Sequence, residues 1–382
     1  MRGEKPLEGM IVLDFSQFLS GPSAALRLAD LGARVIKIER EGTGDICRQL
    51  YISDLEIDGD SSLFHAINRN KESLAVDLKD PDDHQTIVKL IQKADVLIEN
   101  FRPGVMKRLG LSYEEVKAIN PSIVYGEITG YGNEGPWRDR PGQDLLVQAL
   151  SGLCYLNGNA DQPPLPLGLS IVDMAAGAQL VQGLLAGLFH RSMRQQGCRV
   201  QVSLLEAIMD LQFEVFTTFL NDGHEPPQRS QVNNANAYLG APYGIYETAD
   251  GYIALAMGSV TELGKLLACP ALETYTDPAT WFDSRDEIKG LLVDHLKTQK
   301  TEYWLNSLED ADYWCAEVFT WQKLLQHEGF KVLKMIQKVQ RENGIELWTT
   351  RCPIRINGEL LTASKGAPRI GEDTSRILTH IR

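Results

Sequence analysis

Residues 11–39 read IVLDFSQFLSGPSAALRLADLGARVIKIE, and this stretch decides the fold. Its first apolar run, Ile11–Phe15, predicts a buried strand. A predicted helix follows over Pro22–Leu31 and ends at Gly32. The next apolar run, Val35–Glu39, predicts a second strand. The order strand, helix, strand predicts a parallel sheet covered by helices.

The same alternation continues through the first third of the chain. Further apolar runs predict strands at Ser73–Leu78, Val96–Glu99 and Ile123–Ile128, and Asp82–Lys93 is a predicted helix opened by a proline and two acids. Strands that alternate with helices in this way are typical of an α/β fold with a doubly wound parallel sheet.

The rest of the chain is more varied. A long apolar helix begins at about residue 174, a short strand follows at Val200–Ser203, and Leu204–Leu220 has the composition of a second long helix. Residues 221–237 are polar and rich in turn residues, which indicates a linker. Beyond them, two apolar runs on either side of Asp250-Gly251 predict a β-hairpin over residues 243–257.

The composition excludes several classes of function. The 382 residues carry a formal net charge of −13, which disfavours binding to nucleic acid or to an anionic membrane. Six scattered cysteines form no CxxC pair and no zinc-like spacing, so we expect no metal and a reducing, cytoplasmic environment. Met1–Met10 lacks the apolar segment of a signal peptide, and no apolar run is predicted to span a bilayer.

The turn after the first strand, Ser16–Pro22, contains one glycine and no GxGxxG pattern. A nicotinamide or flavin cofactor is therefore not expected. The chain also contains no GxxxxGK[ST] phosphate loop and no GxSxG motif. These absences disfavour nucleotide-triphosphate hydrolysis and the simplest serine-hydrolase function.

Asp173 stands at the start of the long apolar helix and is followed by small residues, Ala175–Ala178. A carboxylate there lies at the positive end of the helix dipole, and the small residues leave room for a large ligand. The plainer alternative is a helix cap, which is the commonest role of an aspartate at this place. The same alternative applies to Asp144, which follows Gln143 and precedes the predicted helix Leu145–Leu150.

A polar loop, Asn100-Phe101-Arg102, leaves the end of the predicted strand Val96–Glu99. The carboxyl ends of parallel strands form ligand crevices, and an amide, an aromatic ring and a guanidinium together suit a nucleotide. A solvent-exposed turn is the alternative. The polar run that contains Lys71 is, by itself, typical of a solvated surface.

Several segments together resemble the class III CoA-transferases, a family that includes formyl-CoA:oxalate and carnitine CoA-transferases and α-methylacyl-CoA racemases. The resemblance covers nearly the whole chain and is most specific in its first half. The matching segments are Pro6–Asp14, Gly21-Pro22, Leu31–Glu39, Glu99–Gly104, Leu109–Leu111, Gly130–Gly132, Gly135–Trp137, Gly142–Asp144 and Gly366–Thr374.

The resemblance implies a specific architecture. It implies a Rossmann-like large domain whose parallel sheet is built from both termini, an inserted smaller α+β domain, and an interlocked homodimer. On this basis we predict a large CoA-binding domain over residues 1–220, a small domain with its linkers over 221–330, and a return to the large domain over 331–382. The substrates would be an acyl-CoA thioester and a carboxylic acid, with no permanently bound cofactor.

The resemblance also assigns site residues. Asp173 matches the aspartate that forms the covalent intermediate. The contacts to coenzyme A would fall on Lys71, Asn100, Phe101 and Arg102, with Gln17 and Phe18 in place of a His/Val pair near the adenine. Gln143, Asp144 and Gly240 would lie at the substrate. Leu19 stands where formyl-CoA transferases have a glutamine, and their glycine-rich loop is missing around Gly240; both departures argue against oxalate or formate as substrate.

Three functions follow from these assignments. The first is transfer of CoA through an aspartyl-CoA thioester on Asp173. The second is racemisation of a 2-methylacyl-CoA, in which a histidine pairs with the aspartate; Gln143 holds the place of that histidine and cannot take a proton, so this function ranks below transfer. The third is a non-catalytic CoA-binding protein.

Overall fold

The computed structural model describes residues 5–52 and 54–381, and the chain divides into two compact units. The first unit contains residues up to 147, 170–211, and 332 onward; the second contains 148–169 and 212–331. The predicted domain ranges differ from these units at three places, because residues 148–169, 212–220 and 331 group with the second unit. Both ends of the chain belong to the first unit, as the resemblance implied.

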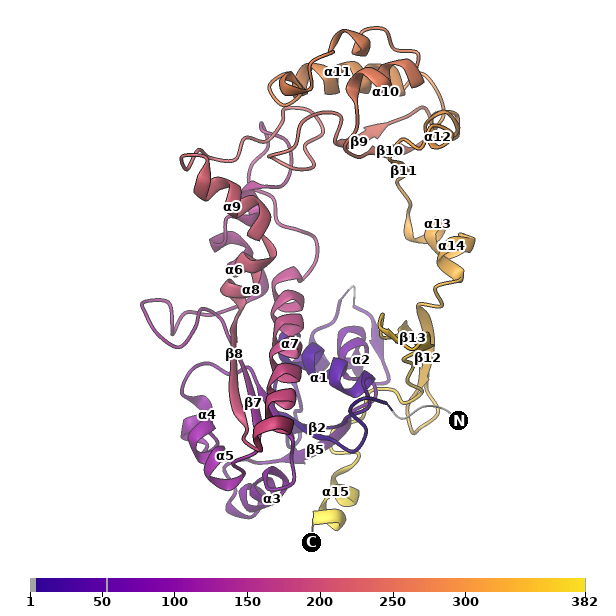
Figure 1. Ribbon diagram of the computed structural model, residues 1–382. Helices are drawn as coiled ribbons and strands as arrows, with labels where there is room; N and C mark the ends of the chain where they lie inside the picture. The colour runs from indigo at the N-terminus through magenta and orange to yellow at the C-terminus, as the bar shows by residue number, and fades with distance from the viewer. Residues whose placement is uncertain (1–4, 53, 382) are drawn as a thin grey trace. The chain divides into compact units, whose positions relative to one another are not determined.

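The first unit is built on a six-stranded sheet (Figure 1) with the order β5-β2-β1-β6-β7-β8. Every neighbouring pair of these strands is parallel. The order is that of doubly wound dinucleotide-binding sheets, which confirms the predicted α/β class. The strands are β1 (Ile11–Asp14), β2 (Arg34–Arg40), β5 (Glu72–Val76), β6 (Val96–Glu99), β7 (Val124–Thr129) and β8 (Cys198–Ser203).

The C-terminal segment joins this sheet without adding a strand to it, which corrects the expectation that the sheet itself is built from both termini. Its last helix, α15 (Thr374–Ile381), packs against β5 and against α3 (Pro81–Ile91). Just before α15, the Asp373 carboxylate accepts a hydrogen bond from the backbone N–H of Ser73 at 2.9 Å, and Asp373 N–H donates to Ser73 O at 3.1 Å. These bonds cover the outer edge of β5.

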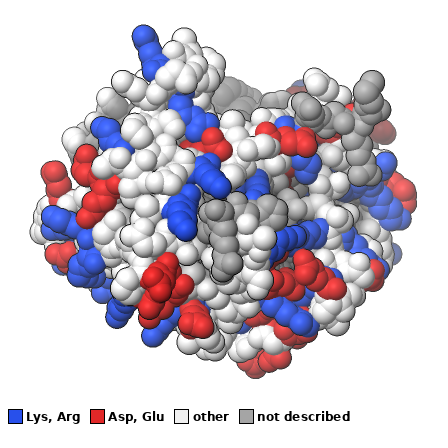
Figure 2. Space-filling view, turned by 90° about the horizontal axis from the view of Figure 1, so that it is seen from below, with Lys and Arg blue, Asp and Glu red and all other residues white. Residues whose placement is uncertain are grey.

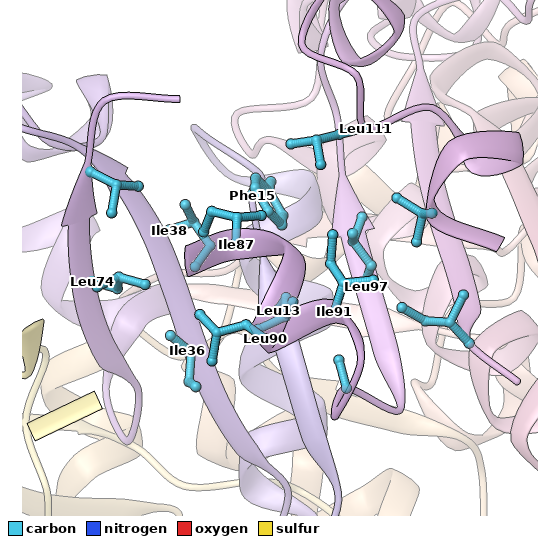
Figure 3. Packing of buried hydrophobic residues seen from close by; sticks show 14 of the residues in the cluster. Leu13, Phe15, Ile36, Ile38, Leu74, Ile87, Leu90, Ile91, Leu97 and Leu111 are labelled. Atoms are coloured by element: carbon cyan, nitrogen blue, oxygen red, sulfur yellow. The ribbon is translucent and has the colours of Figure 1, made fainter. Parts of the chain in front are cut away.

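Successive side chains of a strand point to opposite faces of the sheet, and the strands are apolar at consecutive positions. Both faces are therefore apolar, and helices cover both. On one face, Leu13, Ile36 and Leu97 pack against α3 and α5 (Tyr113–Ile119), and Figure 3 shows Ile87 and Leu90 of α3 over them. The other face is covered by α1 (Ser20–Asp30) and α7 (Ile171–Arg194), which also contact each other extensively. The core of the first unit therefore has three layers.

Helix α7 is long and apolar enough, by length and composition alone, to cross a membrane. This corrects the expectation that no apolar run of the chain is long enough to span a bilayer. Within the first unit, α7 packs against β7, β8 and α1. A Cβ on Gly183 would lie 2.4 Å from Val200 Cγ1, and one on Gly187 would lie 2.8 Å from Cys198 Sγ. These glycines therefore serve close packing of α7 on the sheet.

The predicted helix Leu204–Leu220 is divided at Gln212 into α8 (Leu204–Leu211) and α9 (Phe213–Asn221). In the second unit, β9 (Gly244–Glu247) and β10 (Tyr252–Leu255) form the predicted antiparallel hairpin, and β11 (Cys315–Glu317) pairs with β10. The helices that enclose its apolar core are α10 (Val260–Leu266), α11 (Arg285–Leu296) and α12 (Thr301–Glu309). The short helices α13 (Trp321–Gln326) and α14 (Glu328–Lys331) lead out of this unit.

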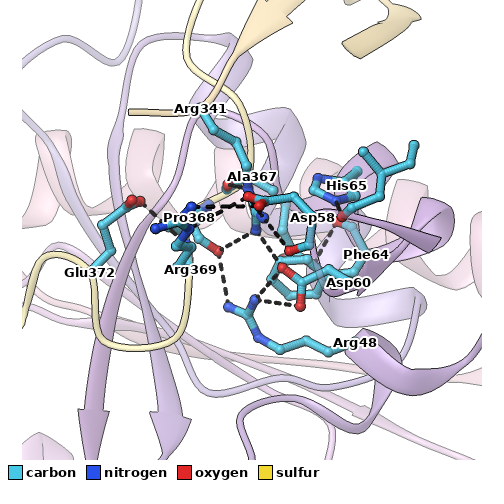
Figure 4. A network of polar contacts seen from close by, with 12 residues as sticks. Arg48, Asp58, Asp60, Phe64, His65, Arg341, Ala367, Pro368, Arg369 and Glu372 are labelled. Atoms are coloured by element: carbon cyan, nitrogen blue, oxygen red, sulfur yellow. Dashed lines mark hydrogen bonds and ion pairs between the residues drawn. The ribbon is translucent and has the colours of Figure 1, made fainter. Parts of the chain in front are cut away.

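A buried ionic network attaches the C-terminal segment to the N-terminal part of the first unit (Figure 4). The Arg48 guanidinium donates to both oxygens of Asp60 at 3.0 Å and to Glu39 Oε2 at 2.6 Å. Arg341, which follows β12 (Ile336–Gln340), forms ion pairs with Asp58 and Asp60 and is itself buried. Every charge in this cluster has an opposite partner, which is the condition for tolerating burial.

The remaining short elements connect these parts of the first unit. They are β3 (Glu56–Ile57), β4 (Asp60–Ser61), α2 (Ser62–Asn68), α4 (Val105–Arg108), β13 (Glu346–Thr350), β14 (Arg355–Ile356) and β15 (Glu359–Leu360). Although the formal net charge is −13, Lys and Arg side chains are interspersed with Asp and Glu on the face drawn in Figure 2. The excess negative charge therefore does not gather into one patch on that face.

Candidate active site

The site lies at the carboxyl ends of β1 and β6, neighbouring strands whose connections leave the sheet in opposite directions. Ligands of open α/β sheets bind at this switch point. Asn100, directly after β6, reaches across to the turn after β1. Its Oδ1 accepts from the backbone N–H of Gln17 at 2.8 Å, and its Nδ2 donates to Gln17 O at 2.7 Å. Asn100 therefore fixes the turn, instead of presenting a free amide to a ligand.

This turn has an unusual backbone. Phe18 has a φ of 62°, a left-handed conformation that is rare for an aromatic residue. Its N–H donates to Asp45 Oδ1 at 3.2 Å, and its ring is 50% exposed. The turn thus presents the Phe18 ring to solvent and directs the chain into α1 at Ser20. An exposed aromatic ring at the switch point is consistent with the predicted contact to the adenine.

Helices α1 and α7 approach each other closely beside this turn. A Cβ on Gly177 would lie 2.3 Å from Ser23 Oγ and 2.8 Å from Ser20 O, distances that no real side chain tolerates. Gly177 is therefore needed to bring α1 and α7 together. The small residues after Asp173 were expected to leave space for a ligand. At Gly177 and the buried Ala176, other parts of the protein fill that space.

The first turn of α7 is capped from another helix. Asp144, the first residue of α6 (Asp144–Leu150), accepts through Oδ2 from the backbone N–H of Val172 at 2.8 Å and of Asp173 at 3.2 Å. Asp144 therefore has a capping role for α7, a helix other than its own. Ser170, which precedes α7, makes no side-chain cap hydrogen bond.

The carboxyl of Asp173 is held differently. Among the residues that the structure describes, no backbone N–H donates to it, so Asp173 is not a cap for its own helix. Burial and the neighbouring charge of Asp144 raise the pKa of this carboxyl to about 6, while a hydrogen bond from the Ser20 side chain opposes the rise. At neutral pH the group is mostly ionised and poorly solvated, and none of the described lysines or arginines is among the groups that shift its pKa.

The other predicted site residues are placed unequally. Phe101 packs partly on the core beside Asn100, Arg102 is exposed, and Gln143 is exposed beside the capping Asp144. Gly240 belongs to the second unit, next to Trp281 and Phe282. In the same unit, residues that include Tyr155, Phe216 and Tyr238 line an apolar cavity of about 750 Å³, and none of the predicted site residues is among them.

Lys71 contradicts its predicted contact with coenzyme A. Its side chain is fully buried, and Nζ donates to Asp14 Oδ2 at 2.8 Å, to Pro22 O at 2.9 Å and to Asn68 Oδ1 at 2.8 Å. An ammonium has three hydrogens, and all three are bound inside the protein. No sequence signal indicated that Lys71 is buried, because a polar run of this kind is equally compatible with an exposed lysine.

Two features of the candidate site were missed by sequence reasoning. The Ser20 side chain lowers the pKa of the Asp173 carboxyl across a large separation in sequence, which no local pattern reveals. Glu99, the last residue of β6, is buried, and this burial together with the charge of Glu127 raises the pKa of its carboxyl to about 8, although the Phe101 N–H bond lowers it. The available signal was the position of Glu99 at the end of a predicted central strand, where an acid is unusual.

Comparisons of the whole chain with known proteins identify its family. Residues 7–374 match the family model described as CoA-transferase family III. The chain is 33% identical over 316 residues to acetyl-CoA:oxalate CoA-transferase of Acetobacter aceti, covering 80% of this chain and 79% of that protein. It is 30% identical to succinyl-CoA:glutarate CoA-transferase of Mus musculus, covering 99% and 86%.

Solved structures lead to the same family. The chain is similar to a CAIB/BAIF family protein from Brucella suis, with a TM-score of 0.86, 28% identity and coverage of 100% of both chains. The fold, the length and the sequence thus agree over the same range of residues. The chain belongs to CoA-transferase family III.

Proposed function

We propose that this CoA-transferase moves coenzyme A from an acyl-CoA thioester to a carboxylic acid through a covalent intermediate on Asp173. The observation that carries the proposal is the state of the Asp173 carboxylate. It is mostly buried at a sheet switch point, its pKa is raised to about 6, and Asp144 performs the capping that would otherwise occupy it. A carboxylate is suited to this chemistry because it forms both an anhydride and a thioester.

The proposed reaction has two symmetrical halves. An oxygen of Asp173 attacks the thioester carbonyl, the C–S bond breaks, and a mixed anhydride and CoA thiolate form. The thiolate then attacks the carbonyl carbon of Asp173, the anhydride C–O bond breaks, and the donor acid leaves an aspartyl-CoA thioester. An acceptor carboxylate repeats the two steps in reverse and regenerates Asp173. No proton, electron or metal is consumed.

The position of Asp173 in the first turn of α7 supports these steps. The positive end of the helix dipole stabilises negative charge, both on the ionised carboxylate and on the oxyanions of the tetrahedral intermediates. Above pH 6 the carboxylate is mainly ionised, so activity should rise with pH through this value. Burial keeps the anion poorly hydrated, which favours its attack on an uncharged carbonyl.

Coenzyme A would bind at the carboxyl ends of β1 and β6. The exposed Arg102 guanidinium is placed to pair with phosphate, and the exposed Phe18 ring to stack on the adenine. Gln17 and Phe101 would complete the pocket. Because the relatives are named for the acids oxalate and glutarate, and Leu19 argues against oxalate or formate, we propose other small mono- or dicarboxylic acids as substrates, with Gln143 and Asp144 facing them.

We also propose that the chain forms a homodimer and acts in the cytoplasm. Helix α9 has no buried residue, and its Phe213 and Phe216 are 68% and 39% exposed. Aromatic side chains exposed in this way are typical of a surface that another subunit covers. The molar mass from light scattering after gel filtration would correspond to one chain if this proposal is wrong.

The racemase alternative remains the lower-ranked function. It needs a base opposite Asp173, and the residue beside the Asp144 cap is Gln143, whose amide takes no proton near neutral pH. Deuterium incorporation at the α-carbon of a 2-methylacyl-CoA, without an acceptor acid, would reverse this ranking.

The decisive test is covalent trapping. The protein is mixed with a panel of acyl-CoA donors, treated with hydroxylamine or borohydride, and analysed by peptide mass spectrometry. A CoA thioester or its trapped product on the peptide that contains Asp173 is expected. Asp173→Ala should lose the adduct and the transfer activity while it still binds CoA. An active Asp173→Ala variant would exclude the proposed nucleophile, and CoA binding without any adduct in the native protein would favour a pure CoA-binding function.

A further inference from the structure

The turn between β1 and α1 is held by side chains from neighbouring elements. Its central residue is Gln17, whose N–H donates to Asn100 Oδ1 at 2.8 Å and whose O accepts from Asn100 Nδ2 at 2.7 Å. The next N–H, that of Phe18, donates to Asp45 Oδ1 at 3.2 Å. The amide of Asn100 thus replaces the backbone partner that these groups would have in a strand or a helix.

The start of the turn is bound in the same way. Ser16 N–H donates to Asp14 Oδ1 at 3.1 Å, and Ser16 O accepts from Lys37 Nζ at 2.8 Å. The Lys37 ammonium also forms an ion pair with Asp45 at 2.8 Å, and both of these side chains are buried. Every backbone N–H and O from Ser16 N–H to Phe18 N–H is therefore bound to a side chain, and these side chains are themselves held in the interior.

Phe18 needs this support because its backbone is strained. Its φ of 62° is left-handed, a conformation that glycine adopts freely and that a residue with a Cβ adopts only where the surrounding structure enforces it. The Phe18 ring is 50% exposed, so packing of the ring does not supply the enforcement. The hydrogen bonds of Asn100 and Asp45 to the backbone supply it instead.

The result is an aromatic ring that is fixed at the switch point before any ligand arrives. The backbone groups of the turn are occupied, so the ring is what the turn offers to a ligand. Among the parts of coenzyme A, only adenine is an aromatic base that stacks on such a ring. A ring that is already fixed loses little freedom when adenine binds, so its stacking energy is retained as affinity.

We propose that Asn100 is a positioning residue for the adenine of coenzyme A: by binding both backbone groups of Gln17, it holds the next residue, Phe18, in the left-handed conformation that presents its ring. The inference rests on the proposed binding of coenzyme A at this switch point and is independent of which residue is the nucleophile. Without Asn100 the turn relaxes, and only the fraction of molecules that still present the ring binds adenine well. Asn100 therefore acts through Phe18 and not by its own contact with the ligand.

The test measures the Kd of free CoA, and of pantetheine as the part of CoA without the nucleotide, by calorimetric titration of the full-length protein. Phe18→Gly keeps the left-handed backbone and removes the ring, so it should weaken CoA binding about 5- to 100-fold, the range for one base stacked on an aromatic ring. Asn100→Ala should weaken CoA binding about 3- to 10-fold, and less than Phe18→Gly. Neither change should alter the Kd of pantetheine. Asn100→Asp keeps the side-chain shape but loses the donor to Gln17 O; it should show a similar loss and serves if Asn100→Ala does not fold.

The double variant Phe18→Gly/Asn100→Ala separates a positioning role from a direct contact. If Asn100 acts through the ring, its loss should cost no further affinity for CoA once the ring is absent. A double variant in which the two losses add in full would overturn the inference, because Asn100 would then contact the ligand itself. Native CoA affinity in Asn100→Ala would overturn it as well.

The matched control is Asn120→Ala. Asn120 follows α5 and also binds two backbone oxygens, Ile91 O and Ala94 O, both at 2.8 Å, but it lies before β7, at the end of the sheet opposite to the site. Asn120→Ala should lower the Tm and keep the native Kd of CoA; an equal loss of affinity would reduce the effect of Asn100→Ala to general destabilisation and reject the inference. Native affinity in Phe18→Gly would reject both the inference and the proposed adenine contact. Failure of the proposed nucleophile is recognised separately, by transfer activity in Asp173→Ala.

Discussion

The replacement Asp173→Asn should make the protein more stable while abolishing its transfer activity. Burial and Asp144 raise the pKa of the Asp173 carboxyl from 3.8 to about 6, so the folded protein holds an anion that it disfavours. Asparagine has the same shape, still accepts a hydrogen bond from Ser20, and carries no charge. The proposed nucleophile therefore lowers the stability of the native state, as is common for strained or desolvated active-site groups.

The magnitude follows from the shift in pKa. A shift of roughly two units corresponds to about 3 kcal/mol, at about 1.4 kcal/mol for each unit. Asp173 is partly exposed, so solvent screens part of this energy, and about 1–2 kcal/mol is expected. For a domain of roughly 150–250 residues, each kcal/mol raises Tm by about 2–4 °C, so an increase of roughly 2–8 °C is expected for the first unit.

The pH dependence provides the sharper test. Below about pH 4, Asp173 is protonated in both the folded and the unfolded protein, so the charge-related gain of Asp173→Asn should vanish. As the pH rises from 3.8 to 6, the unfolded carboxyl ionises more readily than the folded one, and the difference in stability should grow. It should be constant above pH 6. Thermal unfolding of both proteins at pH 4, 5, 6 and 7.5 measures this; an equal Tm at pH 7.5, or a gain that is largest at pH 4, would refute the reasoning.

Three further changes test the surrounding structure. Asp144→Asn keeps an acceptor for the cap of α7 but removes a negative neighbour, so the pH midpoint of activity should fall below about 6 in a pH–rate profile. Gly177→Ala should lower the free energy of unfolding by about 1–3 kcal/mol in a urea titration, because the added Cβ would lie 2.8 Å from a backbone oxygen of α1. Gly290→Ala in α11 is the control: its Cβ meets open space, so the free energy of unfolding should rise by about 0.5–1 kcal/mol. Arg341→Met removes one of the two guanidinium groups that pair with the buried Asp60 and should lower the free energy of unfolding by about 1–3 kcal/mol, whereas Arg369→Met, at an exposed guanidinium, should have a smaller effect in the same titration.

The fold of the first unit could be predicted because its signals are local. Apolar runs of four to six residues, separated by helices with recognisable ends, correspond to β1, β2, β6 and β7 within one residue or two. The hairpin around Asp250-Gly251 was predicted for the same reason. The break at Gln212 was missed, because residues 204–220 keep one apolar pattern across it and the interruption depends on tertiary packing.

The site was only partly predictable, because its contacts join residues that are distant in sequence. Asp173 was chosen because of the small residues behind it, and its catalytic role stays a prediction; one of those residues, Gly177, serves the packing of α1 against α7. Lys71 was assigned to a ligand and is bound in the interior by Asp14. No periodicity or motif distinguishes these outcomes; they depend on which elements the sheet order brings together.

In the proposed mechanism, Asp144 stabilises the start of α7 as its cap, and Asp173 in the same helix turn is the group that reacts. An aspartate that caps a helix accepts hydrogen bonds from backbone N–H groups, which stabilise its ionised form and make it a weaker nucleophile. The first turn of α7 meets this conflict by taking its cap from Asp144, on a different helix, through the N–H groups of Val172 and Asp173. Burial and the repulsion of Asp144 then raise the basicity of the Asp173 carboxylate, while the Ser20 side chain lowers it. If Asp144 were replaced by alanine, α7 would lose its cap, and the Asp173 carboxylate would be expected to turn toward the unpaired N–H groups; stability would fall by about 1–2 kcal/mol and transfer activity would fall with it.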